Sequence, residues 1–343
     1  MPRFVAGNDG AMTTSSSTPA LQSDPSRSSG PDDTIAVSAQ GLRCSYGSYE
    51  AVRGIDLSIR NGEFFALLGT NGAGKTTTME TLEGHRPATS GTLSVLGGDP
   101  HRDRASIRPR LGIMLQEAGF ADDLTVEETC RLWLRLSSAD PEHRSREQVI
   151  ATGLDVLDLA AQTSTRVKML SGGQRRRLDL LLATANQPDL LFLDEPTTGL
   201  DPESRERTWD LVRGLNDAGT TVVLTTHYLE EAEAYADRLA IMHDGTIAVE
   251  GTLSEVLRRE PSMISFEVDA SVDVLQLPRM GLSPDFSPTP ARTQVTVPSL
   301  NLQQDLWSVL SWADANSIHL DRLSASEASL AAVFRRVSLG DAA

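Results

Sequence analysis

The stretch "FFALLGTNGAGKTT" constrains the fold of this chain more than any other. Its short apolar run, residues 64–69, is typical of a strand buried on both faces. The glycine-rich run that follows, residues 69–77, matches the pattern GxxxxGK[ST] and leads directly into a helical segment. Gly72 and Gly74 allow backbone conformations that a Cβ atom would forbid. This order of strand, loop and helix predicts a phosphate-binding loop, with consecutive N–H groups pointing at the phosphate oxygens.

The phosphate-binding loop supplies most of the predicted nucleotide contacts. Lys75 is expected to reach the β- and γ-phosphates, and the Thr76 hydroxyl group is expected to ligate Mg²⁺. A plain strand–turn–helix joint that needs glycine is the alternative, but the length of the match and its context argue against it. The loop residues predicted to contact the nucleotide are Gly69, Thr70, Asn71, Gly72, Ala73, Gly74, Lys75, Thr76 and Thr77.

A second apolar run, "LLFLDEP", ends in two acidic residues. Asp194 closes the predicted strand, where a hard carboxylate can hold Mg²⁺ directly or through a water. Glu195 follows and is expected to orient the attacking water or accept a proton from it. An acidic pair at a strand end is by itself often only a polar loop. After a phosphate-binding loop, it indicates hydrolysis of a nucleoside triphosphate.

The wider pattern predicts an α/β fold. A third apolar run lies at 220–227, and helical stretches at 75–85 and 205–219 alternate with the apolar runs. Buried strands that alternate with helices indicate a core around a mostly parallel sheet. Residues 35–47 and 51–63 instead alternate apolar and polar side chains between glycines, which predicts antiparallel strands.

Composition excludes several classes of protein. The formal charge of −16 disfavours a nucleic-acid partner, because duplex binding needs a basic face that releases counterions. Cys44 and Cys130 are far apart and offer no metal framework, which fits a reducing compartment. No apolar run approaches the ~18 residues of a membrane span, so we expect a cytoplasmic chain. Residues 1–34 are rich in Ser, Thr, Pro, Gly and Asp and are predicted to form a disordered tail.

The pattern of apolar and polar residues changes near residue 260. "MISFEVD" and "TQVTVPS" alternate like strands, and two apolar helical faces follow, so residues 260–343 are predicted to form a small C-terminal α+β domain. It shows no catalytic constellation. The residues expected on the two helical faces are Leu306, Val309, Leu310 and Ala313, then Leu330, Val333, Phe334 and Val337.

Further motifs lie between and after the phosphate-binding loop and the acidic strand end. Gln116 closes an apolar stretch, "LSGGQ" occupies 170–174, "GLDP" occupies 199–202, and His227 ends the third apolar run. Gln116 or His227 taken singly is more often structural. Together these motifs, from about residue 35 to about 257, resemble the ATP-binding cassette family, the nucleotide-binding subunits of ABC transporters. "LSGGQ" between a glutamine loop and an acidic strand end is highly specific to that family.

The resemblance implies an ABC-type nucleotide-binding domain over residues 35–259, with ATP and Mg²⁺ as cofactors. Its fold would comprise a mixed sheet core, an antiparallel β subdomain and a helical subdomain at about 117–175. In the family, two cassettes sandwich two ATP molecules head to tail. One copy would supply the phosphate loop with Gln116, Asp194, Glu195 and His227, and Gln116 would also ligate the metal. The other copy would supply its signature loop, so the residues predicted to contact nucleotide outside the phosphate loop are Ser171, Gly172, Gly173, Gln174 and, against adenine, Tyr46.

Two further segments lie in or just after the predicted helical subdomain. Leu124, Trp133, Leu134 and Leu136 form either a groove for a helix of a membrane domain or local core. The arginines at 175–177 are expected to project toward solvent or acidic partners rather than to bind phosphate.

The expected function is that of an ATPase subunit that energises a separate membrane permease from the inner face of the cell membrane. The segments 228–240 and 327–338 resemble cassettes of drug-resistance-type exporters, which favours export of a drug-like or hydrophobic compound. An importer ATPase shares every catalytic motif and remains an alternative. A soluble cassette acting on ribosomes or DNA is a further alternative, disfavoured because the chain has one set of motifs and no sustained heptads.

Overall fold

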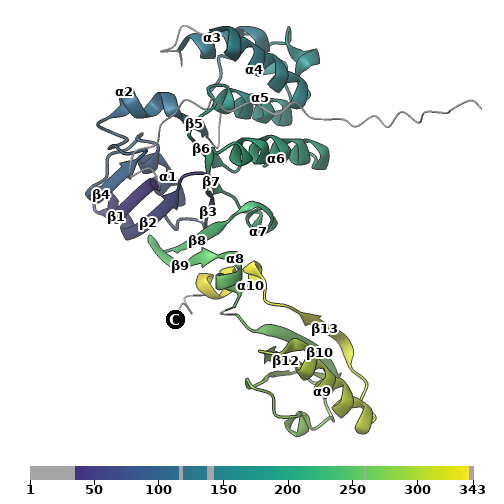
Figure 1. Cartoon of the computed structure of the whole chain (residues 1–343). Helices are drawn as coiled ribbons and strands as arrows, with labels where there is room; N and C mark the ends of the chain where they lie inside the picture. Colours follow the sequence, from purple (N-terminus) through teal and green to yellow (C-terminus); the bar gives the residue numbers. More distant parts are fainter. Residues whose placement is uncertain (1–34, 116–118, 137–142, 259, 340–343) are drawn as a thin grey trace, which may run out of the picture.

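The computed structural model describes residues 35–115, 119–136, 143–258 and 260–339 (Figure 1). The predicted tail, residues 1–34, and the predicted site residue Gln116 lie outside the described residues. The described chain contains a large α/β part and a smaller C-terminal sheet set apart from it at the bottom of Figure 1.

A six-stranded sheet with the order β5-β6-β7-β3-β8-β9 forms the centre of the large part. The first five strands run parallel and β9 runs antiparallel, which confirms the predicted mixed sheet. Every residue of β3 and β7 is buried, as expected for strands covered on both faces. The strands are β3 (Phe64–Gly69), β5 (Leu111–Met114), β6 (Leu190–Asp194), β7 (Thr221–Thr225), β8 (Arg238–His243) and β9 (Thr246–Thr252).

A three-stranded antiparallel sheet, in the order β2-β1-β4, covers one side of the central sheet. Its apolar side chains share a core cluster with those of α1 and of the central strands. This confirms the antiparallel strands predicted from the alternating pattern. The elements are β1 (Ile35–Tyr46), β2 (Tyr49–Arg60), β4 (Ser90–Val95) and α1 (Lys75–Leu82), and the short α2 (Arg104–Ile107) follows β4.

Helices α3 and α4 lie within the segment predicted as a helical subdomain and pack together beyond β5 with α5, which continues past its predicted end (Figure 1). Helix α6 continues this layer, and the ring of Trp209 on α6 stacks on Tyr235 of α7 with the ring centroids 4.5 Å apart. Aromatic stacking of this kind fixes two helices over the same sheet face. The helices are α3 (Val126–Leu136), α4 (His143–Val156), α5 (Gly172–Thr184), α6 (Pro202–Asp217) and α7 (Leu229–Tyr235).

The C-terminal sheet, in the order β11-β12-β10-β13, packs against α9 around its own core. Val309 and Ala313 are buried there as predicted, but Leu310 is exposed and Trp312 takes its place in the core. The buried face of α9 differs from the predicted one because the C-terminal sheet contacts this helix at residues 309, 312 and 313. The elements are β10 (Ser262–Asp269), β11 (Asp285–Pro288), β12 (Arg292–Ser299), α9 (Leu302–Ala315) and β13 (Asp321–Ser326).

The last helix, α10 (Leu330–Ser338), does not join the C-terminal sheet. Its predicted apolar face, Leu330, Val333 and Val337, is buried in a cluster with α7, β8 and α8 (Leu253–Leu257) of the large part. A carboxylate oxygen of Glu233 on α7 accepts a hydrogen bond from the N–H group of Leu330 at 3.0 Å. The chain therefore leaves the α/β part through β10 and returns to it through α10.

Among the described residues, none of the helices is both long enough and apolar enough to cross a membrane.

Candidate active site

The loop between β3 and α1 has the backbone shape that its glycines predict. Gly72 and Gly74 have φ angles of 79° and 99°, in the left-handed region. A Cβ atom on Gly74 would lie 2.5 Å from the carbonyl oxygen of Ala51, so a side chain there would displace the backbone. The Lys75 ammonium group donates to the carbonyl oxygen of Gly69 at 2.7 Å and so curls over the loop. These left-handed turns curve the loop into a cradle, and the Lys75 ammonium group is held over it.

The acidic strand end lies in the electrostatic field of this cradle. Burial lowers the pKa of Lys75, while the negative charges of Glu195 and Asp194 oppose that shift. Glu195 follows Lys75 by 120 residues in the sequence, and the central sheet brings the two together because β6 and β3 flank β7.

Three predicted site residues meet where β6 and β7 end. Glu195 has a φ angle of 50°, and its N–H group donates to the carbonyl oxygen of Thr225 at 2.9 Å. Its carboxylate lies 2.7 Å from Nε2 of His227. The hydroxyl group of Thr225 donates to the carboxylate of Asp194. The carboxylate of Glu195 and the imidazole of His227 thus form a contacting pair, with Asp194 beside them.

Thr76 is exposed in the first turn of α1, and Tyr46 at the end of β1 contacts the same helix. The phenol oxygen of Tyr46 is 3.3 Å from the hydroxyl oxygen of Thr77, which brings the ring to the phosphate-binding loop. The guanidinium group of Arg86 covers one face of that ring, 3.9 Å from its centroid. A stacked base would therefore use the opposite face.

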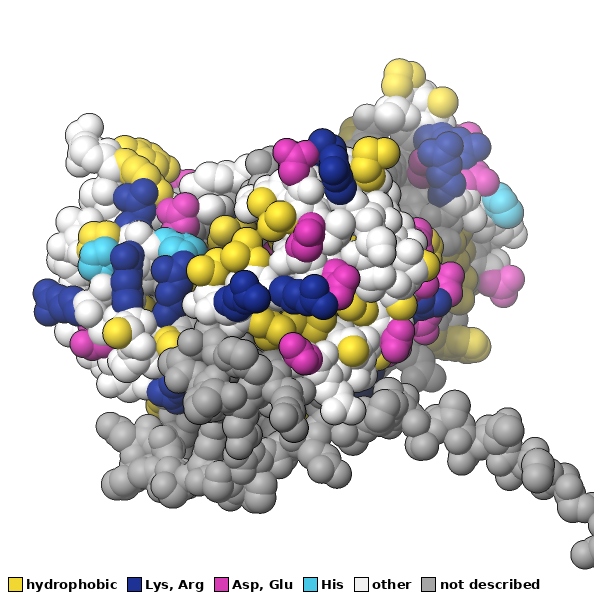
Figure 2. Space-filling model, turned by 90° about the horizontal axis from the view of Figure 1, so that it is seen from above, with side chains coloured by type: hydrophobic (Ala, Val, Ile, Leu, Met, Phe, Trp, Pro, Cys, Tyr) yellow, Lys and Arg dark blue, Asp and Glu magenta, His cyan; other side chains and the backbone are white. Residues whose placement is uncertain are grey.

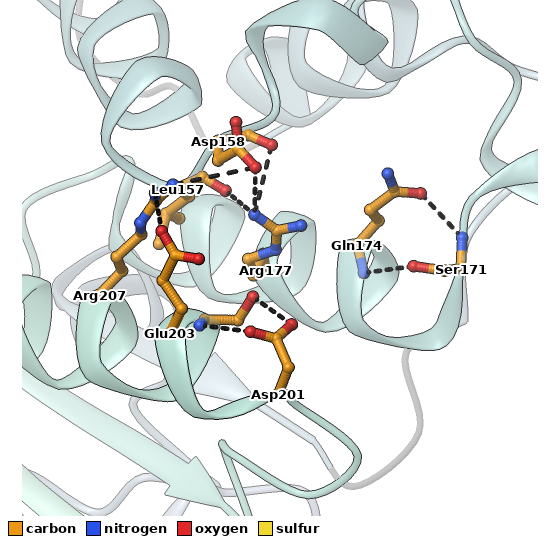
Figure 3. Close-up of polar contacts among 9 residues, drawn as sticks. Leu157, Asp158, Ser171, Gln174, Arg177, Asp201, Glu203 and Arg207 are labelled. Carbon is orange, nitrogen blue, oxygen red and sulfur yellow. Dashed lines mark hydrogen bonds and ion pairs between the residues drawn. The ribbon is translucent and has the colours of Figure 1, made fainter.

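The signature loop begins α5 with a capping box (Figure 3). The Ser171 hydroxyl oxygen accepts the N–H group of Gln174 at 3.2 Å, and the Gln174 side chain accepts the N–H group of Ser171 at 2.9 Å. Gly172 is exposed, and a Cβ atom placed on it would meet no described atom within 4 Å beyond its neighbours and its own helix backbone. The loop is thus satisfied within its own chain and presents an open glycine at a helix N-terminus.

The "GLDP" segment lies beside the signature loop. Asp201 caps α6 by accepting the N–H group of Ser204 at 2.9 Å (Figure 3). A Cβ atom on Gly173 would lie 3.4 Å from the Leu200 side chain. The two segments, residues 170–174 and 199–202, therefore form one surface.

The prediction for the three arginines that follow the signature was wrong in part. Arg177 is buried and donates to the carbonyl oxygen of Leu157 at 2.6 Å and toward Asp158 (Figure 3). Arg176 is also turned inward, with its side chain 10% exposed. Arg175 alone follows the prediction, since it reaches the acidic Asp122 at the surface. Carbonyl groups at strand and helix ends lack backbone donors, and the two inward guanidinium groups satisfy several of them.

Asp179 gives a pH-dependent contribution to stability. Burial raises its pKa to about 7, and Arg176, 3.6 Å away, opposes the shift. The ordinary pKa of 3.8 governs the unfolded chain. Between about pH 4 and pH 7 the unfolded chain releases the proton while the folded chain keeps it, so stability falls as pH rises, by about 1.4 kcal/mol per unit. We expect the melting temperature of Asp179→Asn to rise relative to wild type across this window. A pH-independent difference, matching an exposed control such as Asp314→Asn, would contradict this.

A groove separates the helical subdomain from the end of β5. Its volume is about 720 Å³, and its lining includes Trp133 and Leu136 of α3, Leu115, and the basic Arg104 and Arg108. Figure 2 shows hydrophobic side chains bordered by basic and histidine side chains on the face seen from above.

The four apolar residues predicted to form either a groove or local core divide between these two environments. Trp133 and Leu136 are 41% and 73% exposed and line the groove. Leu134 packs on the core cluster of the helices instead. Leu124 is partly buried and is not among the lining residues.

Sequence reasoning missed Glu231, a buried carboxylate beside the site. It accepts hydrogen bonds from the hydroxyl groups of Thr226, at 2.6 Å, and Thr197. These threonines adjoin His227 and Glu195 by one and two residues respectively, so the network joins the two loops. The threonine pairs at 197–198 and 225–226, one near the end of each strand, were the sequence feature that could have indicated a buried hydrogen-bond acceptor.

These features define a class of protein. A glycine-rich phosphate loop after β3, an acidic pair and a histidine at adjacent strand ends, and a separate capped signature helix are the parts of an ABC-type ATPase. Residues 52–198 match the sequence profile of the ABC transporter family. Residues 262–329 match that of an ABC transporter domain-containing protein-like C-terminal domain, a range that ends before α10.

Three characterised relatives identify the family. They are the daunorubicin/doxorubicin resistance ATP-binding protein of Streptomyces peucetius (42% identical, covering 65% of this chain and 67% of the relative), the linearmycin resistance ATP-binding protein of Bacillus subtilis (30%; 87% and 96%) and the Nod factor export ATP-binding protein I of Cupriavidus metallidurans (39%; 66% and 74%). The chain therefore belongs to the ATP-binding subunits of the ABC transporter family and is an ATPase. The predicted resemblance to this family and to its drug-resistance-type exporters is confirmed.

Solved structures agree with the fold. An ATP-binding subunit of an ABC transporter aligns with a TM-score of 0.62 at 25% identity, covering 65% of this chain and 92% of that one. A dimeric bacterial ABC transporter cassette aligns with a TM-score of 0.58 at 25% identity, covering 63% and 98%. A post-hydrolysis cassette dimer bound to ADP and Pi gives 0.58 at 26% identity, with 63% and 98% covered.

Proposed function

We propose that this chain hydrolyses ATP to drive export through a separately encoded membrane permease, and that the cargo is a drug-like or hydrophobic compound. The contact between Glu195 and His227 at 2.7 Å, in the field of Lys75, carries the hydrolytic part of the proposal. The names of the relatives, which refer to drug resistance and to export, support the choice of cargo and direction.

The chemistry is attack of water on the γ-phosphate. The backbone N–H groups of the phosphate loop and the Lys75 ammonium group bind the β- and γ-phosphates, so the growing negative charge meets donors already in place. Glu195 orients the water and accepts its proton, and His227, whose Nε2 lies 2.7 Å from that carboxylate, holds it in place and contacts the γ-phosphate. Gln116 would complete the site from the loop after β5. Tyr46 would stack on the adenine.

The residues present suit Mg²⁺. Thr76 offers an exposed hydroxyl oxygen and Asp194 a carboxylate at the strand end, and hard oxygen ligands are those that Mg²⁺ prefers. Among the described residues no cluster of three His, Cys, Asp or Glu side chains could hold a metal on its own. That suits an ion that takes its remaining ligands from phosphates and water, with Gln116 as a further protein ligand. Bound there, Mg²⁺ would neutralise charge on the β- and γ-phosphates.

A second copy of the chain would complete each site. The open Gly172, together with Gly173 and the Ser171 hydroxyl group, would face the γ-phosphate bound by the partner, while Gln174 fixes the loop from behind. The dimeric cassettes to which this chain is similar support this arrangement. Hydrolysis would then depend on assembly, because neither copy holds a whole site.

The groove beside α3 would receive a helix of the permease, and the chain would then act at the inner face of the membrane. Leu136 is 73% exposed, so Leu136→Asp should fold with an unchanged melting temperature. We expect it to lose co-purification with the permease from detergent-solubilised membranes, because an aspartate would be buried in the contact. A tagged chain and mass spectrometry identify the membrane protein that co-purifies with wild type.

The matched control is Leu275→Asp, at an 82% exposed leucine in the C-terminal part. It should co-purify with the permease like wild type. A wild-type chain that fractionates with ribosomes and leaves membranes unbound would count against transport.

A further inference from the structure

Arg176, the second residue after the signature motif, binds the ends of two strands of the central sheet. Its guanidinium group donates to the carbonyl oxygens of Asp194, Glu195 (2.9 Å) and Pro196 (3.3 Å) after β6. It also donates to the carbonyl oxygen of Leu115 after β5. A residue of the signature helix therefore holds the backbone that carries the catalytic carboxylate.

The backbone at Glu195 needs such a partner. Its φ angle of 50° is in the left-handed region, which a residue with a Cβ atom adopts at a cost. The N–H group of Glu195 is bound by the carbonyl oxygen of Thr225, and its own carbonyl, one residue past the end of β6, accepts the N–H group of Thr198 at 3.2 Å besides the guanidinium group. The planar, always charged guanidinium group has five N–H donors, enough to bind several carbonyls at once.

The same guanidinium group connects three functional regions. Asp179, one helical turn further on, lies 3.6 Å from it and favours its inward orientation. The side chain of Leu115 lines the groove beside α3. Arg176 thus contacts the segment of Glu195 and the floor of the groove from the helix whose N-terminus is the signature loop.

We propose that Arg176 is a positioning residue for ATP hydrolysis: it holds residues 194–196 in the conformation that presents the Glu195 carboxylate to the attacking water. This assignment rests on the function proposed above for Glu195. A shift of the signature helix on dimer closure, or of Leu115 on binding of a permease helix, moves this backbone through the one guanidinium group. Arg176 therefore couples both partners to the catalytic carboxylate of its own chain.

The test compares Arg176→Met and Arg176→Lys with the neighbouring control Arg175→Met in the full chain. Misplacement of a catalytic group by about 1 Å can cost on the order of 10²-fold in rate, so we expect kcat of Arg176→Met to fall by about that factor. The KM for ATP should stay near that of wild type, because Arg176 does not touch the nucleotide. Arg176→Lys should show a smaller loss than Arg176→Met, because an ammonium group can still bind one strand end. Its kcat should remain below that of wild type, because one ammonium group cannot bind both strand ends. Arg175→Met, whose guanidinium group binds Val167 and Asp122, should keep the wild-type kcat.

A double-mutant cycle separates positioning from general damage. In the Glu195→Gln background, Arg176→Met should cause no further loss of rate, because the group it positions is already disabled. A wild-type kcat in Arg176→Lys, or losses that add fully in the double variant, would overturn the assignment. If Arg176→Met does not fold, Arg176→Lys decides, as it keeps the positive charge beside Asp179. Normal turnover by Glu195→Gln alone would instead overturn the proposed role of Glu195.

Discussion

Glu195→Gln should lower kcat for ATP hydrolysis by about 10²- to 10⁴-fold, the range for loss of a general base. Glutamine keeps the shape of the side chain and can still accept a hydrogen bond from His227, but it cannot take the proton of the attacking water. Binding of MgATP should persist, because the phosphate loop and Lys75 are unchanged. Since hydrolysis no longer removes the γ-phosphate, the nucleotide-bound dimer should accumulate.

Steady-state phosphate release measures the rate, and size-exclusion chromatography with and without ATP measures the dimer. The matched control is Glu203→Gln, at a surface carboxylate that is 75% exposed. It should hydrolyse ATP like wild type and show no trapped dimer. Turnover by Glu195→Gln at the wild-type rate would remove this residue from the catalytic role.

Gly172→Asp should abolish cooperative ATP hydrolysis while leaving nucleotide binding by the monomer intact. Gly172 is not in the left-handed region, and a Cβ atom there has open space within its own chain. An acidic residue in the first turn of α5 even suits the helix dipole, so the variant should fold. In the proposed dimer, the added carboxylate would face the γ-phosphate of the partner. We expect kcat to fall by at least the ~10²- to 10³-fold typical of losing one oxyanion donor.

Complementation shows whether this loss acts in trans. Lys75→Ala disables the phosphate loop but keeps an intact signature, and Gly172→Asp has the opposite defect. A head-to-tail dimer of the two variants contains one site with both halves intact, so mixing two inactive proteins should restore hydrolysis. Gly281→Asp, at an exposed loop glycine, serves as the charge control. Loss of nucleotide binding by monomeric Gly172→Asp, or no recovery on mixing, would contradict the trans assignment.

The sequence predicted well those helices, strands and turns that depend only on neighbouring residues. The apolar run at 64–69 became β3, and the glycines of the phosphate loop have the positive φ angles that their positions require. The alternating runs became the antiparallel β1 and β2. Each of these depends on a pattern of neighbouring residues, which the amino-acid sequence states directly.

Long-range packing was not readable in the same way. Arg176 and Arg177 were expected at the surface because charged side chains usually are, yet carbonyl groups from Leu115, Leu157 and Asp194 draw them inward. The apolar face of α10 was recognised, but the surface it covers belongs to α7 and β8 rather than to the preceding sheet. An apolar stripe along a helix shows which side of the helix is buried, but it does not show which element covers that side.

By itself, the sequence determined the backbone of the phosphate loop and the separate capped signature helix, because each is a short run whose residue types favour one local conformation. Only the tertiary structure decided that Glu195 contacts His227, that α10 returns to the ATPase part, and that Arg176 binds the strand ends at Leu115 and Glu195. The reason is that these contacts depend on how strands and helices pack in three dimensions, which brings together residues from 19 to 97 positions apart in the sequence.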